Sequence, residues 1–226
     1  MEAADQTRPI ELRQLHLLED CEPHSAALNM AIDEVLLGMI TTPTLRIYRW
    51  RKPSLSFGYF GRFDDVAHEA DRREVVRRWT GGGMVLHGAD LTYSFLLPQK
   101  EIAAAASARA VYVFVHRAIG QALQSIARVE LAARDAPKIS DACFANPVVA
   151  DVLIADRKIA GAAQRRTRAG LLHQGSIQYE QLPPLFVADF ATALCPTYRQ
   201  VDVTPSPAAE TLAAQKYATP EWLHRR

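Results

Sequence analysis

The sequence is poor in cysteine and glycine and has no long apolar run. Its 226 residues include only 11 glycines and three cysteines, at positions 21, 143 and 195. A sparse, odd number of cysteines does not indicate a disulfide framework, so we expect a reducing, cytoplasmic environment. No apolar stretch approaches the roughly 18 residues that a membrane-spanning helix needs. The polar N-terminal stretch MEAADQTRPIEL also lacks a signal-peptide core, so we expect no membrane association.

Excess charge of one sign is also absent. The net charge is +1, which argues against binding nucleic acid through a broad basic face. Hydrophobic residues make up 49% and charged residues 23%, as in an ordinary globular protein. The length predicts one domain over residues 1–226. The chain becomes proline-rich and polar from about residue 196, where we expect a short irregular tail.

Periodicity predicts mixed secondary structure. Apolar residues at helical spacing indicate helices at 25–40, with Ser25 as N-cap, and at 105–127 and 183–194, and a short surface helix at 64–74. Strands are predicted at 10–18, 44–50, 54–60, 75–79, 91–97 and 171–180, and a hairpin at 151–166 around Asp156–Arg157. Because regular βαβ alternation is missing, the fold class is α+β, with a largely antiparallel sheet flanked by helices.

The stretch RRWTGGGMVLHGADL, residues 77–91, concentrates glycine between basic and apolar residues. Three adjacent glycines are costly to order, so the loop is either a tight turn or a cradle that lets backbone approach a ligand. It is not a phosphate-binding P-loop, because no Lys-Ser/Thr follows, and it does not open a helix. The amides of Gly81, Gly82 and Gly83 are candidates to face an acyl carbonyl or a phosphate. His87, isolated beside apolar residues, is as a type more often structural than catalytic.

Cys143 and Lys158 form the second candidate site. Cys143 lies in an irregular segment between two prolines, and Lys158 opens the second strand of the predicted hairpin. Most free cysteines are small buried hydrophobes, and a lysine at a strand start is usually solvated. If Lys158 instead turns inward, its ammonium would favour a thiolate. Lowering the usual thiol pKa of about 8.5 by roughly 1.5 units would leave the thiol about half ionised near pH 7.

Four segments in this order resemble the biotin/lipoate protein ligase and lipoyl-transferase superfamily. They are LNMAIDEVLL, TLRIYRWRKPSLSFGYF, RRWTGGGMVLHGADLTYS and RKIAGAAQRR with the following LLHQGSI. The resemblance covers roughly residues 10–194 and implies a ligase-type catalytic domain. The cysteine-dependent octanoyltransferases and their amidotransferase relatives are the most similar branch, because Leu91 lies four residues after His87 and Cys-Phe precedes the hairpin. Gly88 and Ala162 depart from that pattern, which has Asp and Ser there.

The resemblance implies roles for ten residues. Cys143 matches the family's nucleophile and Lys158 its catalytic lysine. The residues matched to substrate binding lie in the glycine-rich loop, after it, and in the strands of the last segments: Arg77, Arg78, Gly81, Gly82, Gly83, His87, Gly161 and Gly175. No metal site is expected, since no CxxC or HxxxH pairing occurs.

The implied reaction moves an octanoyl group from acyl carrier protein, through a thioester on Cys143, to a lysine of a lipoyl carrier domain. That domain would be the glycine cleavage H protein or a 2-oxoacid dehydrogenase E2. A thioester donor is already activated, so no cofactor is expected. Three alternatives stay open: an ATP- and Mg²⁺-dependent lipoate ligase, an octanoyl amidotransferase acting between lipoyl domains, and a catalytically inactive module that binds acyl carrier protein. Neither nucleic acid nor membrane is an expected partner.

Overall fold

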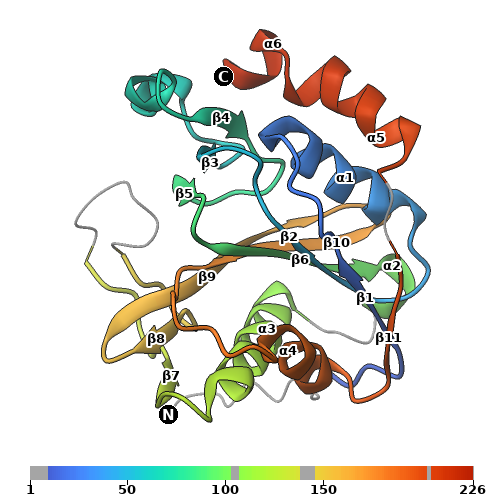
Figure 1. Cartoon of the computed structure of the whole chain (residues 1–226), viewed down its shortest axis with the longest axis vertical. Coiled ribbons are helices and arrows are strands. Elements are labelled where there is room, and N and C mark those ends of the chain that lie inside the picture. Colours follow the sequence, from blue (N-terminus) through green and yellow to red (C-terminus); the bar gives the residue numbers. More distant parts are fainter. Residues whose placement is uncertain (1–9, 103–106, 138–145, 203–204, 226) are drawn as a thin grey trace.

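The computed structural model describes residues 10–102, 107–137, 146–202 and 205–225. Its largest element is an eight-stranded sheet, ordered β11-β1-β2-β6-β10-β9-β8-β7, beside a three-stranded sheet, ordered β4-β3-β5 (Figure 1). Within the described ranges, only the pairs β1–β11, β1–β2 and β3–β4 of the named strands are parallel. The prediction of an α+β fold with a largely antiparallel sheet is therefore confirmed.

The strands are short at the edges of the large sheet and long at its centre. Their bounds are β1 Leu15–Glu19, β2 Thr44–Tyr48, β3 Ser54–Phe57, β4 Glu74–Arg77, β5 Val85–His87, β6 Leu91–Pro98, β7 Val129–Leu131, β8 Val152–Ile154, β9 Arg157–Arg166, β10 Gly170–Ile177 and β11 Tyr198–Gln200. The three-residue strands β5, β7 and β11 escaped sequence analysis, because so few residues carry no recognisable alternation.

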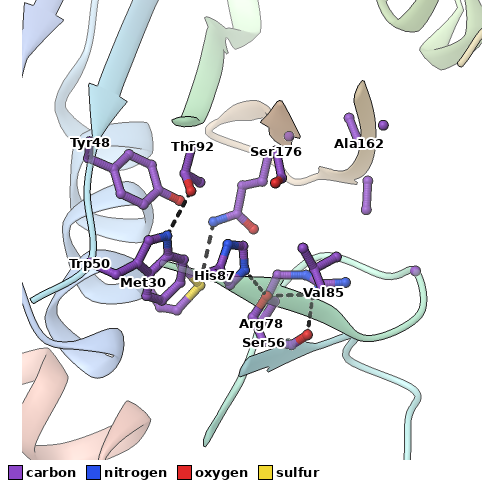
Figure 2. Close-up of a pocket in the computed structure, with 15 residues that line it drawn as sticks. Met30, Tyr48, Trp50, Ser56, Arg78, Val85, His87, Thr92, Ala162 and Ser176 are labelled. Carbon is purple, nitrogen blue, oxygen red and sulfur yellow. Dashed lines mark hydrogen bonds between the residues drawn. The ribbon is translucent and has the colours of Figure 1, made fainter. Parts of the chain in front are cut away.

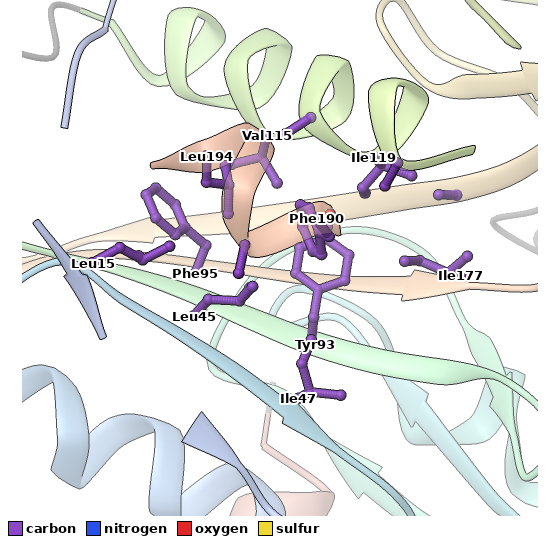
Figure 3. Close-up of a cluster of buried hydrophobic side chains, with 14 of the residues drawn as sticks. Leu15, Leu45, Ile47, Tyr93, Phe95, Val115, Ile119, Ile177, Phe190 and Leu194 are labelled. Carbon is purple, nitrogen blue, oxygen red and sulfur yellow. The ribbon is translucent and has the colours of Figure 1, made fainter. Parts of the chain in front are cut away.

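Helices cover both faces of the large sheet. The main hydrophobic core lies on the face covered by α3 (Ala108–Leu123) and α4 (Phe186–Leu194), where Tyr93 and Phe95 of β6 meet Phe190 (Figure 3). The opposite face carries α1, together with the C-terminal helices (Figure 1). The remaining helical elements are α1 Ala26–Met39, α2 Gln99–Ile102, α5 Pro207–Leu212, α6 Pro220–Leu223 and a π-helical turn Ala213–Tyr217.

Helix α1 begins where the sequence predicts. The Ser25 side chain accepts a hydrogen bond of 3.3 Å from the Leu28 amide, which satisfies one of the helix's free N–H groups. The sheet-facing side of α1 is not purely apolar, because it buries Asn29 and Asp33. Both bind the guanidinium of Arg46 from β2, which is fully buried. This face of the sheet is therefore a polar layer, in contrast to the apolar face under α3 and α4.

The predicted hairpin is formed by β8 and β9. Its two turn residues, Ala155 and Asp156, both have positive φ angles, 47° and 61°, as a two-residue type I′ turn requires. The sequence placed the turn at Asp156–Arg157. In the structure Arg157 is the first residue of β9 and pairs with Ile154, so the turn consists of Ala155 and Asp156 alone.

Two other local predictions are wrong. The stretch 64–74 contains two 3₁₀ turns, Phe63–Asp65 and Ala67–Glu69, and its last residue opens β4. No α-helix forms, because Val66 alone gives this polar stretch a buried anchor. The tail after residue 196 is not irregular: it forms β11, α5, the π-helical turn and α6.

The C-terminal helices α5 and α6 are short, and each is stabilised at its start by a capping side chain. Ser206 and Thr219 accept bonds from the Ala209 and Trp222 amides, and each is followed by proline. These helices are too short to show a periodic apolar pattern. The prolines of the segment therefore led to the prediction of an irregular tail. The domain assignment for residues 1–226 stays a prediction.

Candidate active site

A pocket opens between α1, the two sheets and the glycine-rich loop. Its empty volume is about 410 Å³, including space open to solvent. Met30, Tyr48 and Trp50 form one side, and Ala162 of β9 lies on the other (Figure 2). The lining also includes Ser56, Arg78, Gly82, Val85, His87, Thr92, Gly161, Ala163, Gln174, Gly175 and Ser176. Five of the residues that the sequence assigns to substrate binding, among them Arg78 and His87, therefore meet around one space.

Arg78 gives the glycine-rich loop its shape. Its Nη1 donates 2.8 Å hydrogen bonds to both the carbonyl and the Oγ of Ser56, and its Nη2 donates to the Gly81 and Gly83 carbonyls at 2.9 and 2.8 Å. The chain between those carbonyls turns through Gly82, whose φ is +87°. Only glycine adopts that conformation without strain. The loop is therefore a rigid wall of the pocket held by a buried cation.

Ser56, His87 and Asp90 form a hydrogen-bonded row behind that wall. His87 Nε2 lies 2.7 Å from Ser56 Oγ, and His87 Nδ1 lies 2.8 Å from Asp90 Oδ2. Burial lowers the His87 pKa, and this outweighs the opposing effect of Asp90. Burial acts to raise the Asp90 pKa, but hydrogen bonds from His87 and Ser176 lower it overall. A neutral imidazole thus stacks on Trp50, with ring centroids 4.0 Å apart.

The polar side chains around the pocket satisfy one another. Gln174 donates to Asp33 at 2.7 Å and accepts from Thr80 at 2.7 Å. Ser176 donates to Asp90 at 2.7 Å. Thr92 accepts from Trp50 and donates to Asp90. Because these groups are already hydrogen-bonded, an aliphatic ligand can occupy the pocket without leaving them unpaired.

Lys158 turns inward instead of lying on a solvated edge. It is 5% exposed, and its Nζ lies 2.8 Å from Oδ2 of Asp151, which is fully buried. The ammonium passes over Gly161: a Cβ there would lie 2.7 Å from Nζ. The missing side chain at Gly161 therefore lets Lys158 lie beside the pocket, to which Gly161 itself contributes.

Other predicted residues have different surroundings. Cys143 lies outside the described residues. Arg77 does not line the pocket: its guanidinium donates to the carbonyls of Tyr59, Gly61, Trp222, Leu223 and Arg225. It thereby joins β4 to the C-terminal helix. Arg77 ends β4 and Arg78 directly follows it, and adjacent residues of an extended chain point to opposite sides.

Gly175 lines the pocket and also has to be a glycine for packing. A side chain there would collide with the ring of Tyr93 on the neighbouring strand. The sequence analysis missed Asp90, Asp151 and Gln174. Asp90 had a signal, since it lies three residues after a candidate histidine. Asp151 had one too, since it heads the apolar strand DVLIA.

Two of the three loop glycines, Gly81 and Gly82, provide a matched test of the loop's shape. An alanine Cβ at Gly81 would meet nothing within 4 Å, whereas at Gly82 it would meet Arg78 Nη2 at 3.2 Å and Ala163 Cβ at 3.3 Å, at a φ of +87°. We expect Gly82→Ala to lower stability by about 1–2 kcal/mol through backbone strain. It should lower the transfer activity that the sequence predicts about tenfold or more, by narrowing the pocket.

Gly81→Ala is the control and should change stability by no more than about 0.5 kcal/mol. Melting temperature and transfer rate would be measured on the same preparations. Equal melting temperatures and equal transfer rates of the two variants would show that the conformation at Gly82 matters for neither stability nor activity.

The chain matches known proteins over most of its length. Residues 25–199 match the family model described as lipoyl protein ligase A/B catalytic domain. An octanoyltransferase LipM from Oceanobacillus iheyensis is 41% identical over 166 residues, covering 69% of this chain and 60% of that protein. LipM from Kyrpidia tusciae is 34% identical, covering 73% and 66%. The chain thus spans about 60 to 66% of the length of these relatives.

Solved structures agree on the fold. A bipartite lipoate protein ligase from Thermoplasma acidophilum, described together with its E2 lipoyl domain, gives a TM-score of 0.64 at 21% identity, covering 95% of this chain and 96% of that chain. P. falciparum LipL1 in complex with lipoate gives 0.66 at 15% identity, covering 94% and 74%. With the family model matching most of the chain, this protein belongs to the lipoyl protein ligase A/B catalytic domain family.

Proposed function

We propose that the chain is an octanoyltransferase of protein lipoylation. The observation that carries this proposal is the 41% identity to an octanoyltransferase over 166 residues. The pocket supports it independently, because its polar groups are mutually satisfied and His87 is held neutral, which suits an aliphatic acyl chain. Gly82, His87, Gly161 and Gly175 would contact that chain.

The proposed reaction has two steps. The Cys143 thiolate attacks the octanoyl carbonyl, the carbon–sulfur bond to the donor breaks, and the donor sulfur leaves as a thiolate. The neutral amine of an acceptor lysine then attacks the new thioester. The carbon–nitrogen bond forms, the bond to Cys143 breaks, and the proton lost by nitrogen neutralises the released thiolate. Lys158, beside the pocket at Gly161, is the group we assign to orienting the thioester and moving that proton.

The donor would be octanoyl-acyl carrier protein and the acceptor a lipoyl carrier domain of an H protein or an E2. The reaction would need no cofactor, because the donor thioester supplies the free energy. No helix in the described part of the chain is long and apolar enough to cross a membrane.

The ligase alternative needs cations that bind ATP phosphates. The sequence offered Arg78 and Lys158 for this, yet Arg78 binds loop carbonyls and Lys158 binds a carboxylate. Both Nη atoms of Arg78 already donate two hydrogen bonds each, and the charge of Lys158 is already paired with Asp151. This favours a donor that arrives activated.

An assay with and without nucleotide tests the proposal. We expect octanoyl transfer from octanoyl-carrier protein to a lipoyl domain in the absence of ATP and Mg²⁺, followed by the mass of the acceptor. Free octanoate or lipoate with ATP should give no more product than a reaction without enzyme. Acylation that occurs only from a free acid with ATP would establish the ligase instead.

A further inference from the structure

Asp151 is held in position by an unusual backbone turn. The preceding residue, Ala150, has a φ of +70°, a conformation that costs an alanine about 1 kcal/mol or more. Helix α3 secures this turn, since His116 Nδ1 lies 2.6 Å from the Ala150 carbonyl. Burial lowers the His116 pKa to about 4, so the ring is neutral and Nδ1–H donates to that oxygen. Strain maintained by a buried contact often marks a functional position.

Three donors converge on the Asp151 carboxylate. Oδ2 accepts from Lys158 Nζ at 2.8 Å and from the Val148 amide at 2.7 Å. Oδ1 accepts from the Tyr112 hydroxyl at 2.6 Å. Asp151 is fully buried, and a buried carboxylate needs such partners to remain charged. The carboxylate therefore has one fixed orientation, and the ammonium that it binds has a fixed position.

Tyr112 connects this ion pair to the pocket wall. Its hydroxyl donates to Asp151 and accepts from the Ala162 amide at 3.2 Å, and Ala162 lines the pocket. Burial, reinforced by the neighbouring Asp151 charge, raises the Tyr112 pKa, so the hydroxyl keeps its proton. One side chain from α3 thus fixes the distance between the carboxylate and the strand that carries both Lys158 and the pocket.

We propose that Asp151 is a positioning residue for Lys158, and that Tyr112 orients Asp151 for this task. Beyond contact distance an ammonium paired with a carboxylate acts as a dipole, so its effect on a reacting group depends on which end faces that group. Asp151 lies on the protein side of the pair, with Val148 and Tyr112. Nζ lies over the pocket-lining Gly161, 2.7 Å from where a Cβ would be, and Asp151 Oδ1 lies farther from that point, at 3.1 Å. This inference rests on the proposed acyl transfer.

Variants of the full-length chain test the inference. We expect Asp151→Asn to lower kcat about 100-fold and Tyr112→Phe about tenfold, because the ammonium loses its fixed position. The KM for octanoyl-carrier protein should stay within about twofold, since neither residue lines the acyl pocket. The matched controls are Asp156→Asn, in the exposed turn of the same hairpin, and Tyr179→Phe; both should retain wild-type kcat. A tyrosine or aspartate with a purely structural role would lower melting temperature without this separation of kcat from KM.

A rescue experiment covers the case in which Asp151→Asn does not fold. Ethylammonium added to Lys158→Ala should restore part of the octanoyl transfer to the acceptor domain, because Asp151 can hold the added cation. The same amine should restore none in Lys158→Ala/Asp151→Asn. Equal rescue of both variants, or folded Asp151→Asn or Tyr112→Phe with wild-type kcat, would overturn the inference. If wild-type protein transfers no octanoyl group, the proposed function fails instead, and the same variants are compared with lipoate and ATP.

Discussion

Replacing Cys143 with serine is expected to lower octanoyl transfer by on the order of a thousandfold or more, since a hydroxyl with a far higher pKa is a much poorer nucleophile than a thiolate. In the unmodified protein, octanoyl-carrier protein without acceptor should add one octanoyl mass, located on Cys143. Intact-protein mass spectrometry followed by peptide mapping measures both results. The buried ammonium of Lys158 is the group expected to favour the thiolate.

The other two cysteines are the controls. Cys21 is exposed, and Cys195 is buried with its Sγ 3.3 Å from the Leu12 carbonyl. Serine at either position should leave the adduct and the transfer rate unchanged. An adduct on Cys21 or Cys195, or full activity in Cys143→Ser, would contradict the thioester mechanism and favour adenylate chemistry.

Arg46→Met is expected to cause the largest loss of stability, about 3–5 kcal/mol, because it leaves buried carboxylates without their cation. Arg46 donates to Asp33 and Asp20 at 2.8 Å, and to the carbonyl and side-chain oxygens of Asn29 at 3.1 and 2.8 Å. Burial acts to lower the Arg46 pKa, but Asp33 and its other neighbours raise it overall, so the side chain is always charged. Urea unfolding of the two proteins measures the difference.

Arg49→Met is the matched control, three residues along the chain and exposed. It should change stability by no more than about 0.5 kcal/mol. Arg46→Met should also disturb the pocket, because Asp33 accepts from Gln174, which lines it. Similar unfolding midpoints for the two variants would show that the buried polar layer contributes little to stability.

Local sequence determined the parts of the fold that depend on near neighbours. Ser25 starts α1 because its hydroxyl reaches an amide three residues away. The β8–β9 hairpin depends on two turn residues, Ala155 and Asp156. The glycine-rich loop was recognisable because three adjacent glycines are costly to order and so indicate a tight turn or a ligand-binding loop. The four segments that resemble the ligase superfamily, in their order along the chain, were enough to predict the family and the fold class.

Tertiary structure alone decided which charged side chains are buried and what they contact. Arg46 and Arg49 lie in the same predicted strand, TLRIYRW, and nothing in its sequence marks either as buried. Only Arg46 binds the buried carboxylates of Asp33 and Asp20. Arg77 and Arg78 were treated as a pair, but one binds the C-terminal carbonyls and the other the glycine loop. Such partners lie up to 148 residues apart in the chain.

The ion pair beside the pocket shows the same limit. Lys158 was recognisable as a candidate, but Asp151 and Tyr112 were not, because no local pattern relates a tyrosine on α3 to a carboxylate 39 residues later. Burial makes that pairing obligatory, since a carboxylate removed from water must find donors from whichever elements pack around it. The sequence by itself determined the main helices and strands and the family, and it predicted the types of the reacting residues. The packing of α3 and α1 against the two faces of the sheet decided which of those residues are held, oriented and paired.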